Sequence, residues 1–421
     1  MAINSRENIL QTVTNYYLKS RDFNGTPFNS VSLPGDGHTL IIRKLVRDGL
    51  LSINFGDIHP NPHIMAFEPE PIKVQLEKLK KNKLKYACLY PTKKYLDRMV
   101  NKSSYSDKPF TLMLALGEPS LGFRVFDPNV LELYRNDPRY NFDTDDVHGS
   151  LSVKFKYFEN GKLRKRDNIF IQTFGFAYNK SLSKRAVAVY IYYLSGLSAE
   201  HQQFWYGKML KGKYFLHPDY YRSTMGDFPD KVSIFTAFIE ELHHINKMSS
   251  LMGRPMLFKE EYREDKKPRG FGFLLRPTLK EFNDFCHLLD KMVSENINKD
   301  FFKNDIPLNF EETLSGNKIK IIPKGSLVLL EEWLSRVHFP DPVPKNRMIK
   351  VFRSIRKLRQ PPAHKVEEDI FNQKYFSKQR KLVIDAYSAI RTLRLIFANH
   401  PRVKGYKDIP DWLFKGDIRA F

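Results

Sequence analysis

The stretch that most constrains the fold and the chemistry of this chain runs from residue 345 to residue 365 and reads KNRMIKVFRSIRKLRQPPAHK. It contains eight Lys or Arg residues and no acid. Apolar residues recur at helical spacing in its first part, which predicts a helix from Lys345 to Leu358. Pro361 and Pro362 then end this helix, because proline lacks an amide donor and disfavours helical geometry in the residue before it.

Arg359 and His364 follow this helix and carry side chains that suit phosphodiester chemistry. An imidazole titrates near neutral pH, so it accepts or donates a proton without special tuning. A guanidinium stays charged and offers forked donors to a phosphate. His364 is expected near the start of the next helical pattern, where backbone amides favour an anion. The two residues therefore predict a site that holds and cleaves a phosphodiester.

Arg359, the polar Gln360 and His364, set between two helical patterns, resemble the Arg-x4-6-His motif of the HEPN superfamily of helical ribonucleases and nucleotide-binding domains. The resemblance covers roughly the last third of the chain. It implies that an RNA 2'-hydroxyl attacks the adjacent phosphate, with His364 as general acid or base and Arg359 holding the phosphate. It implies no metal and no other cofactor.

The resemblance also implies a homodimer. Members of the family commonly dimerise so that two motifs face each other, and one motif offers only one imidazole. Gln360 stands where the family more often has Asn, Asp or His, and two prolines follow it. These departures leave open an alternative, a non-catalytic module that binds RNA or nucleotide and dimerises. The enzyme would be the toxin or effector of a bacterial defence or stress system, and whether a neutralising partner exists is open.

The charge of the whole chain favours a polyanionic partner. Its 421 residues include 69 Lys and Arg against 47 Asp and Glu, a net charge of +22 and a pI near 9.6. This surplus attracts nucleic acid, and RNA is the partner that fits the motif. We expect four cations around the motif to contact RNA: Arg353, Arg356, Lys357 and Lys365.

The periodicity of the chain predicts an α+β amino-terminal region followed by an all-α HEPN-like helical bundle. The expected parts are an α+β region from 1 to 146, a hairpin-containing α+β region from 147 to 275, which can be continuous with the first, and the bundle from 276 to 421. The chain length allows two or three domains.

Individual elements are expected throughout the chain. In the carboxy-terminal part, Thr278 should cap a helix with Glu281 in the capping-box position. Further helices are expected at 327–337, 345–358 and 375–398, and an apolar stripe predicts one at 232–251. In the amino-terminal part we expect a strand at 110–116, a hairpin from strands at 151–157 and 169–173, and helices at 183–194 and 199–209.

Two features indicate a cytoplasmic protein that does not enter the membrane. The amino terminus lacks the apolar core of a signal peptide, and no stretch reaches the roughly 18 apolar residues of a spanning helix. Cys88 and Cys286 lie far apart in unlike contexts, which suits a reducing compartment and indicates neither a disulfide framework nor a CxxC metal site.

Three other patterns offer weaker alternatives. The segment Arg269–Arg276 resembles the RNP1 octapeptide of RNA recognition motifs, except that its last position is Arg276. The segment Glu240–His244 has the Glu-x-x-His spacing of helical metal sites, but we find no second copy, which favours a solvated helix face. The acids at 143, 145 and 146, with His148, fit either a magnesium-dependent nuclease or an Asp-rich turn.

Overall fold

The computed structural model describes residues 6–31, 36–81, 84, 86–145, 147–159, 163–180, 184–227, 231–263, 266–314, 318–359 and 368–419. The chain forms two compact units: unit 1 comprises Met1–Phe142 and Ser150–Leu216, and unit 2 comprises Asp143–Gly149 and His217–Phe421. It is 50% helical and 17% strand, so the expected mixture of helix and sheet is confirmed. The division into three parts at 146 and 275 stays a prediction.

Unit 1 begins with a small sheet covered by helices. Its elements are α1 (Arg6–Lys19), β1 (Thr26–Pro27), α2 (Phe28–Val31), α3 (Asp36–Arg47), β2 (Leu51–Asn54), α4 (Ile72–Lys80), β3 (Cys88–Pro91), α5 (Lys93–Met99), the 3-10 helix η1 (Lys102–Tyr105) and α6 (Pro109–Ala115). The three strands lie in the order β1-β3-β2 and are antiparallel. Ile9, Val13, Ile42 and Leu89 are fully buried in the core between this sheet and its helices.

The rest of unit 1 is built on a larger sheet with strand order β4-β8-β7-β6-β5, in which β9 also pairs with β7. Its elements are β4 (Phe123–Phe126), η2 (Pro128–Leu131), α7 (Glu132–Asn136), β5 (Tyr140–Thr144), β6 (His148–Val153), α8 (Phe155–Glu159), η3 (Lys165–Asp167), β7 (Phe170–Asn179), β8 (Arg185–Tyr190), α9 (Ile191–Ser195), α10 (Ala199–Gly207) and β9 (Tyr214–Leu216). The last two residues of β5 and the first two of β6 fall within the Asp143–Gly149 segment of unit 2.

Three expected elements of unit 1 differ wholly or in part from the structure. The strand expected at 110–116 is helix α6. Pro109 is its first residue, a position where the amide that proline lacks would have no partner in the helix. The next amide, that of Phe110, donates to Gln202 Oε1. The strand expected at 151–157 ends at Val153, and α8 follows it. The helix expected at 183–194 contains strand β8, whose fully buried apolar run has the composition of either element.

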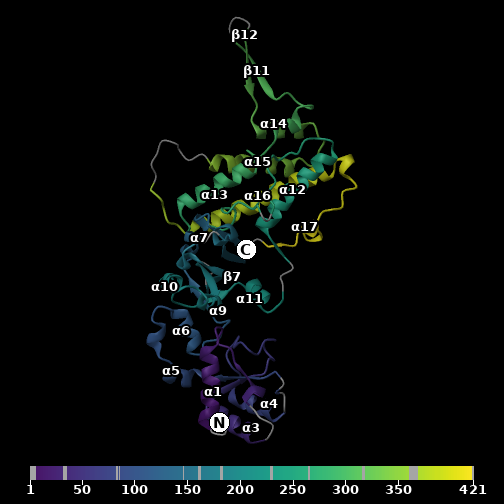
Figure 1. The fold of residues 1–421 in the computed structure, drawn as a ribbon. Coiled ribbons are helices and arrows are strands. Elements are labelled where there is room, and N and C mark those ends of the chain that lie inside the picture. Colours follow the sequence, from purple (N-terminus) through teal and green to yellow (C-terminus); the bar gives the residue numbers. More distant parts are fainter. Residues whose placement is uncertain are drawn as a thin grey trace. The chain divides into compact units, whose positions relative to one another are not determined.

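Unit 2 contains the longest helices. Its elements are α11 (Pro218–Thr224), β10 (Val232–Ser233), α12 (Ile234–Leu251), α13 (Leu279–Met292), η5 (Lys299–Phe302), β11 (Asn309–Leu314), β12 (Lys318–Pro323), α14 (Ser326–Ser335), α15 (Val343–Leu358), α16 (Lys374–Ala398), η6 (Pro401–Val403), α17 (Asp411–Lys415) and β13 (Ile418–Arg419). Helix α16 packs against α12 and α15, and α13 packs against α15 (Figure 1).

The helices expected at 327–337, 345–358 and 375–398 are confirmed with end points that differ by no more than two residues. Thr278 caps α13 by accepting a hydrogen bond from the backbone amide of Glu281. The expectation of an all-α region is wrong, because β11 and β12 form an antiparallel hairpin that projects beyond α14 (Figure 1). Lys318 to Ile321 alternate polar and apolar residues, which is the strand period.

A buried ion pair joins α12 to α16 in the core of unit 2. The side chains of Glu241 and Arg394 are 0% and 2% exposed, and Arg394 Nε donates to the Glu241 carboxylate. Burial raises the pKa of Glu241, although the nearby guanidinium groups oppose this shift. Each of these buried charges would be strongly unfavourable without the other. The pair therefore adds little net free energy of folding, and it favours the alignment of α12 and α16 in which the two side chains meet. None of the described helices is long and apolar enough to cross a membrane.

We predict that Arg394→Met will lower the free energy of unfolding of unit 2 by about 3–5 kcal/mol, because Glu241 then stays buried without a cation. The double variant Glu241→Leu/Arg394→Met should recover most of this loss, since no unpaired charge remains. Urea unfolding followed by circular dichroism measures both. A single variant as stable as the wild type would contradict the assigned role of the pair.

Candidate functional site

Arg359 lies at the carboxyl end of α15, where its backbone amide donates to the Ile355 carbonyl at 3.2 Å. Its side chain is 27% exposed and reaches the carboxyl end of α13. There Nη1 donates to Asp290 Oδ2 at 2.7 Å and also to the Glu295 carboxylate. Arg359 therefore joins the ends of α13 and α15.

The environment of Asp290 explains why this arginine is needed. The Asp290 carboxylate is 0% exposed and accepts a second hydrogen bond from Ser294 Oγ. A buried carboxylate without a cation is strongly unfavourable, so Arg359 contributes to the structure of unit 2. The hydrogen bond with Asp290, with help from Glu295, raises the pKa of Arg359, which keeps its guanidinium charged.

The guanidinium still has hydrogen-bond donors to offer. An arginine carries five N–H donors in a planar fork. Within the described part of the chain, both carboxylates contact Nη1 alone, so Nε and Nη2 are left for another oxygen ligand. A phosphate oxygen suits these donors, because its negative charge and its geometry both match the fork.

His364, Gln360 and Lys365 lie outside the described residues, so their positions are not part of this geometry. The described ends of the intervening segment are both held on α13. One end is Arg359, bound to Asp290 near the carboxyl end of this helix. The other end is Asp369, whose Oδ1 accepts from the Lys280 amide at 2.9 Å near the amino end. Arg359 and His364 stay a predicted pair.

The other expected RNA contacts lie along α15, which carries six Lys or Arg residues and no acid. Lys357 is exposed and Arg356 is half-buried. Arg353 is 57% exposed and pairs with Glu331 of α14. Arg347 and Lys350 are exposed on the same helix, so α15 presents a positive surface that ends at Arg359.

The octapeptide-like segment at 269–276 cannot bind bases in the way that RNA recognition motifs do. Its two aromatic side chains, Phe271 and Phe273, are 1% and 4% exposed. Each ring centroid lies 5.2 Å from that of Phe235 on α12, and Phe271 also stacks on Phe285 of α13. Rings that fill a core have no face for a base, so the RNA-recognition alternative is wrong.

The Glu-x-x-His segment of α12 does not gather its side chains around one point. Glu241 points into the core towards Arg394. His244 Nδ1 lies 2.7 Å from the Tyr406 hydroxyl and its Nε2 lies 3.3 Å from Glu240, whereas His243 faces Glu261 at 3.7 Å. Across the described ranges, no group of three or more His, Cys, Asp or Glu side chains has an arrangement that could hold a metal ion.

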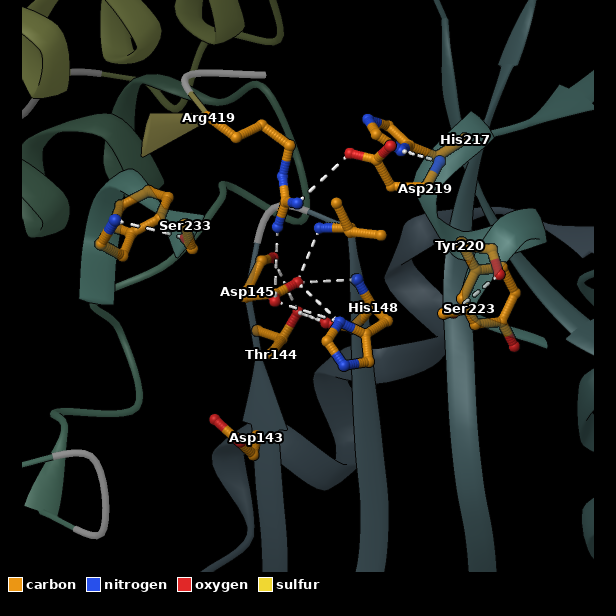
Figure 2. Close-up of polar contacts among 12 residues, drawn as sticks. Asp143, Thr144, Asp145, His148, His217, Asp219, Tyr220, Ser223, Ser233 and Arg419 are labelled. Carbon is orange, nitrogen blue, oxygen red and sulfur yellow. Dashed lines mark hydrogen bonds and ion pairs between the residues drawn. The ribbon is translucent and has the colours of Figure 1, made fainter. Parts of the chain in front are cut away.

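The acidic group near His148 forms a turn in which each described carboxylate has its own cation. Asp145 accepts from the amides of Val147 and His148, both at 2.7 Å, and lies 3.0 Å from His148 Nδ1 (Figure 2). Arg419 lies 3.9 Å from Asp145 and 3.3 Å from Asp219 on the other side.

The remaining acids of this group do not complete a magnesium site. Asp143 lies apart from these contacts and pairs with Lys267 at 3.0 Å, and Asp146 is outside the described residues. Mg²⁺ needs carboxylates that converge and are not already neutralised. The described geometry is that of an Asp-rich turn.

Neither cysteine is an activated nucleophile. Burial raises the pKa of Cys88 to about 11 and that of Cys286 to about 12, so both thiols are protonated at neutral pH. Cys88 Sγ lies 3.6 Å from Nδ1 of His63, a neighbour that the sequence did not indicate. Because the thiol is buried and protonated, this cysteine–histidine contact does not provide a thiolate.

An open hollow of about 430 Å³ lies in unit 1. Its lining includes Asp57, Glu68 and Glu70 beside apolar residues. Lys78 pairs with Asp57 at 2.5 Å and with Glu70 at 2.7 Å, and Lys93 pairs with Glu68 at 2.5 Å. Two lysines thus pair with the three acids. His59 also lines the hollow, and its Nδ1 accepts from the Asn61 amide at 3.2 Å.

Sequence reasoning missed the two acids that hold Arg359. Asp290 and Glu295 precede this arginine by 69 and 64 residues, so no local pattern joins them. One signal was present: Asp290 directly follows Leu289 on the buried face of α13, and a buried acid requires a cation.

Comparison with known proteins gives no relative, since no family model, curated protein or solved structure matches this chain.

We predict that Arg359→Ala will lower the urea midpoint of unit 2 more than Lys357→Ala, a matched removal of a nearby exposed cation. Arg359→Lys should fall between them, because an ammonium keeps the charge but not the fork. Circular dichroism during urea unfolding measures the order. Equal midpoints for the two alanine variants would show that Asp290 does not depend on Arg359.

A second prediction concerns the pH dependence of the Asp145–His148 contact. Although burial opposes it, the hydrogen bond and charge of His148 lower the pKa of Asp145, and the hydrogen bond with Asp145 raises the pKa of His148 above 6.5. The contribution from His148 is therefore complete below its ordinary pKa and is lost as pH rises through the raised value. The contribution from Asp145 is lost as pH falls through its lowered value.

His148→Gln should therefore destabilise the protein at about pH 6 and have little effect at about pH 9. His148 is 53% exposed, so the difference should stay below about 1 kcal/mol. Urea unfolding of both proteins at the two pH values provides the measurement. An effect of equal size at both would exclude an ionic contribution.

Proposed function

We propose that this protein is a metal-independent endoribonuclease of HEPN type, which cleaves RNA through Arg359 and His364. The observation that carries the proposal is the position of Arg359. This arginine ends the strongly basic helix α15 and is kept charged by the buried Asp290. Among the residues that the structure describes, its carboxylate partners contact Nη1 and leave Nε and Nη2 as donors. These properties suit an arginine that stabilises charge on a phosphate.

The proposed reaction is an internal transesterification. The 2'-hydroxyl oxygen attacks the adjacent phosphorus and loses its proton to a base, while an acid protonates the departing 5'-oxygen. The products are a 2',3'-cyclic phosphate and a 5'-hydroxyl, so atoms and charge balance without water or metal. Arg359 stabilises the extra negative charge on the phosphate in the transition state.

The two proton transfers explain the proposed oligomer. The motif supplies one imidazole, at His364, and the reaction uses one base and one acid. In a two-fold symmetric dimer, His364 of the partner subunit supplies the second group, and the site is composite. Arg353, Arg356, Lys357 and Lys365 contact phosphates of the RNA on either side of the cleaved bond. The resemblance adds the cellular role, a toxin or effector of a bacterial defence or stress system.

A specific observation favours a second candidate, a non-catalytic module that binds RNA or nucleotide and dimerises. Arg359 already contacts two carboxylates, which satisfy much of its charge. An arginine used mainly to hold two helices together is compatible with RNA binding on α15 without cleavage. The two candidates share the partner and differ in the role of His364.

The test is to incubate purified protein with total cellular RNA in the presence of a chelator. We predict that the wild type cleaves RNA and that His364→Ala reduces the rate by about 10²–10⁴-fold, the usual contribution of a general acid or base. RNA affinity should be nearly unchanged. His338→Ala removes an exposed histidine after α14 and is the matched control, which should cleave like the wild type.

Cleavage by His364→Ala at the wild-type rate would refute the proposed mechanism. RNA that the wild type binds but leaves intact would favour the binding module. Arg359→Ala discriminates less well, because it weakens both phosphate contact and the structure of unit 2.

A further inference from the structure

Three large aromatic side chains in unit 1 are exposed to solvent. Phe155 and Phe158 of α8 are 72% and 60% exposed, and Phe170 at the start of β7 is 65% exposed. Single exposed apolar residues are ordinary, but exposed phenylalanines in one region indicate a surface with a partner. Phe155 and Phe158 are three residues apart on a helix, so they lie on the same face.

Contacts through Arg139 bring the segments that carry these rings together. The Lys154 amide, just before α8, donates to the Arg139 carbonyl at 2.9 Å. The Arg139 guanidinium pairs with Asp167 of η3 at 3.3 Å, and the Tyr140 hydroxyl donates to the Asp167 carbonyl at 3.0 Å. Phe170 begins β7, which pairs with β6, the strand that leads into α8.

The same region is positively charged. Lys156, Arg164 and Arg166 are exposed, and the Lys156 ammonium lies 5.0 Å from the centre of the Tyr157 ring. Asp137 and Asp167 share the single guanidinium of Arg139, which offsets one of their two charges. Glu159 of α8 and Glu200 of α10 are exposed acids of this region, and Glu200 interacts electrostatically with Arg166.

We infer that this aromatic–basic surface, formed by Phe155, Phe158, Phe170, Lys156, Arg164 and Arg166, binds single-stranded RNA. Unpaired bases stack on exposed aromatic rings, and cations on the same segments contact the phosphates that join those bases. A duplex keeps its bases stacked inside, so it offers nothing to the phenyl rings. An apolar protein partner would explain the rings but not the exposed cations of the same segments. The choice of RNA rests on the proposed function.

The inference is tested by fluorescence anisotropy with the full chain carrying His364→Ala, so that the probe is not cleaved. The probes are a fluorescein-labelled 12-nucleotide single strand of mixed A and U and a duplex of the same length. Phe155→Ser/Phe158→Ser/Phe170→Ser should raise the Kd for the single strand by about 100-fold, since each stacked base contributes at least about fivefold. The Kd for the duplex should change less than threefold.

Two matched variants control for other effects. Phe215→Ser removes a phenylalanine of β9 that is 52% exposed, and it should leave the Kd unchanged. Replacing the three rings by tyrosine should preserve binding, because tyrosine keeps the aromatic face. If the triple serine variant does not fold, Arg164→Ser/Arg166→Ser tests the same surface, and should lower the slope of log Kd against log salt by about 1–2.

Unchanged single-strand affinity in the triple serine variant would overturn the inference, as would an equal loss of affinity for the duplex. Failure of the proposed function gives a different result. If the wild type leaves RNA whole while the phenylalanine variants lose binding, this surface is upheld and the nuclease is not. If His364→Ala abolishes cleavage and the phenylalanine variants bind normally, the nuclease is upheld and this surface is not.

Discussion

The buried carboxylate of Asp290 is the constraint on which the candidate site depends. It has no access to water, so it must have a cation, and Arg359 is the cation that reaches it. This contact holds the carboxyl end of α15 against the carboxyl end of α13. The motif begins at Arg359. This one side chain therefore both joins two helix ends and is the proposed ligand of the phosphate.

This dual use has a chemical consequence. A guanidinium held by a carboxylate on Nη1 cannot rotate freely, and its other donors point in a defined direction. Such preorganisation is what a transition-state contact needs, because no reorganisation occurs as charge develops. The other candidate sites lack this feature: the described acids near His148 are neutralised by their own cations, and Phe271 and Phe273 are buried.

Long helices were predictable from the sequence, and short elements were not. Helices α14, α15 and α16 have enough turns for the apolar period to identify them, and the carboxyl end of α15 followed from the two prolines after it. In unit 1, strand β8 is a short run buried on all sides, and α6 has only seven residues. Such segments have the same composition in a helix or a strand, so contacts distant in sequence decide between them.

The candidate site was predictable in part for a similar reason. Local spacing identified Arg359 and the basic helix before it, because these features lie within one stretch of sequence. Its partners Asp290 and Glu295 come from another helix, and only the packing of α13 on α15 brings them together. The exposed phenylalanines of α8 were not predictable either. The sequence around Phe155 alternates like a strand, so that residue was expected in a strand and not on an exposed helix.

The central claim is that the protein cleaves RNA without a metal, by attack of the RNA's own 2'-hydroxyl on the adjacent phosphate. The most direct measurement is the chemistry of the fragment ends after digestion in a chelator, read by enzymatic end labelling and mass spectrometry. The account predicts 2',3'-cyclic phosphates on the upstream fragments and 5'-hydroxyls on the downstream ones. Fragments with 3'-hydroxyl and 5'-phosphate ends, or cleavage that stops when the chelator is added, would contradict it.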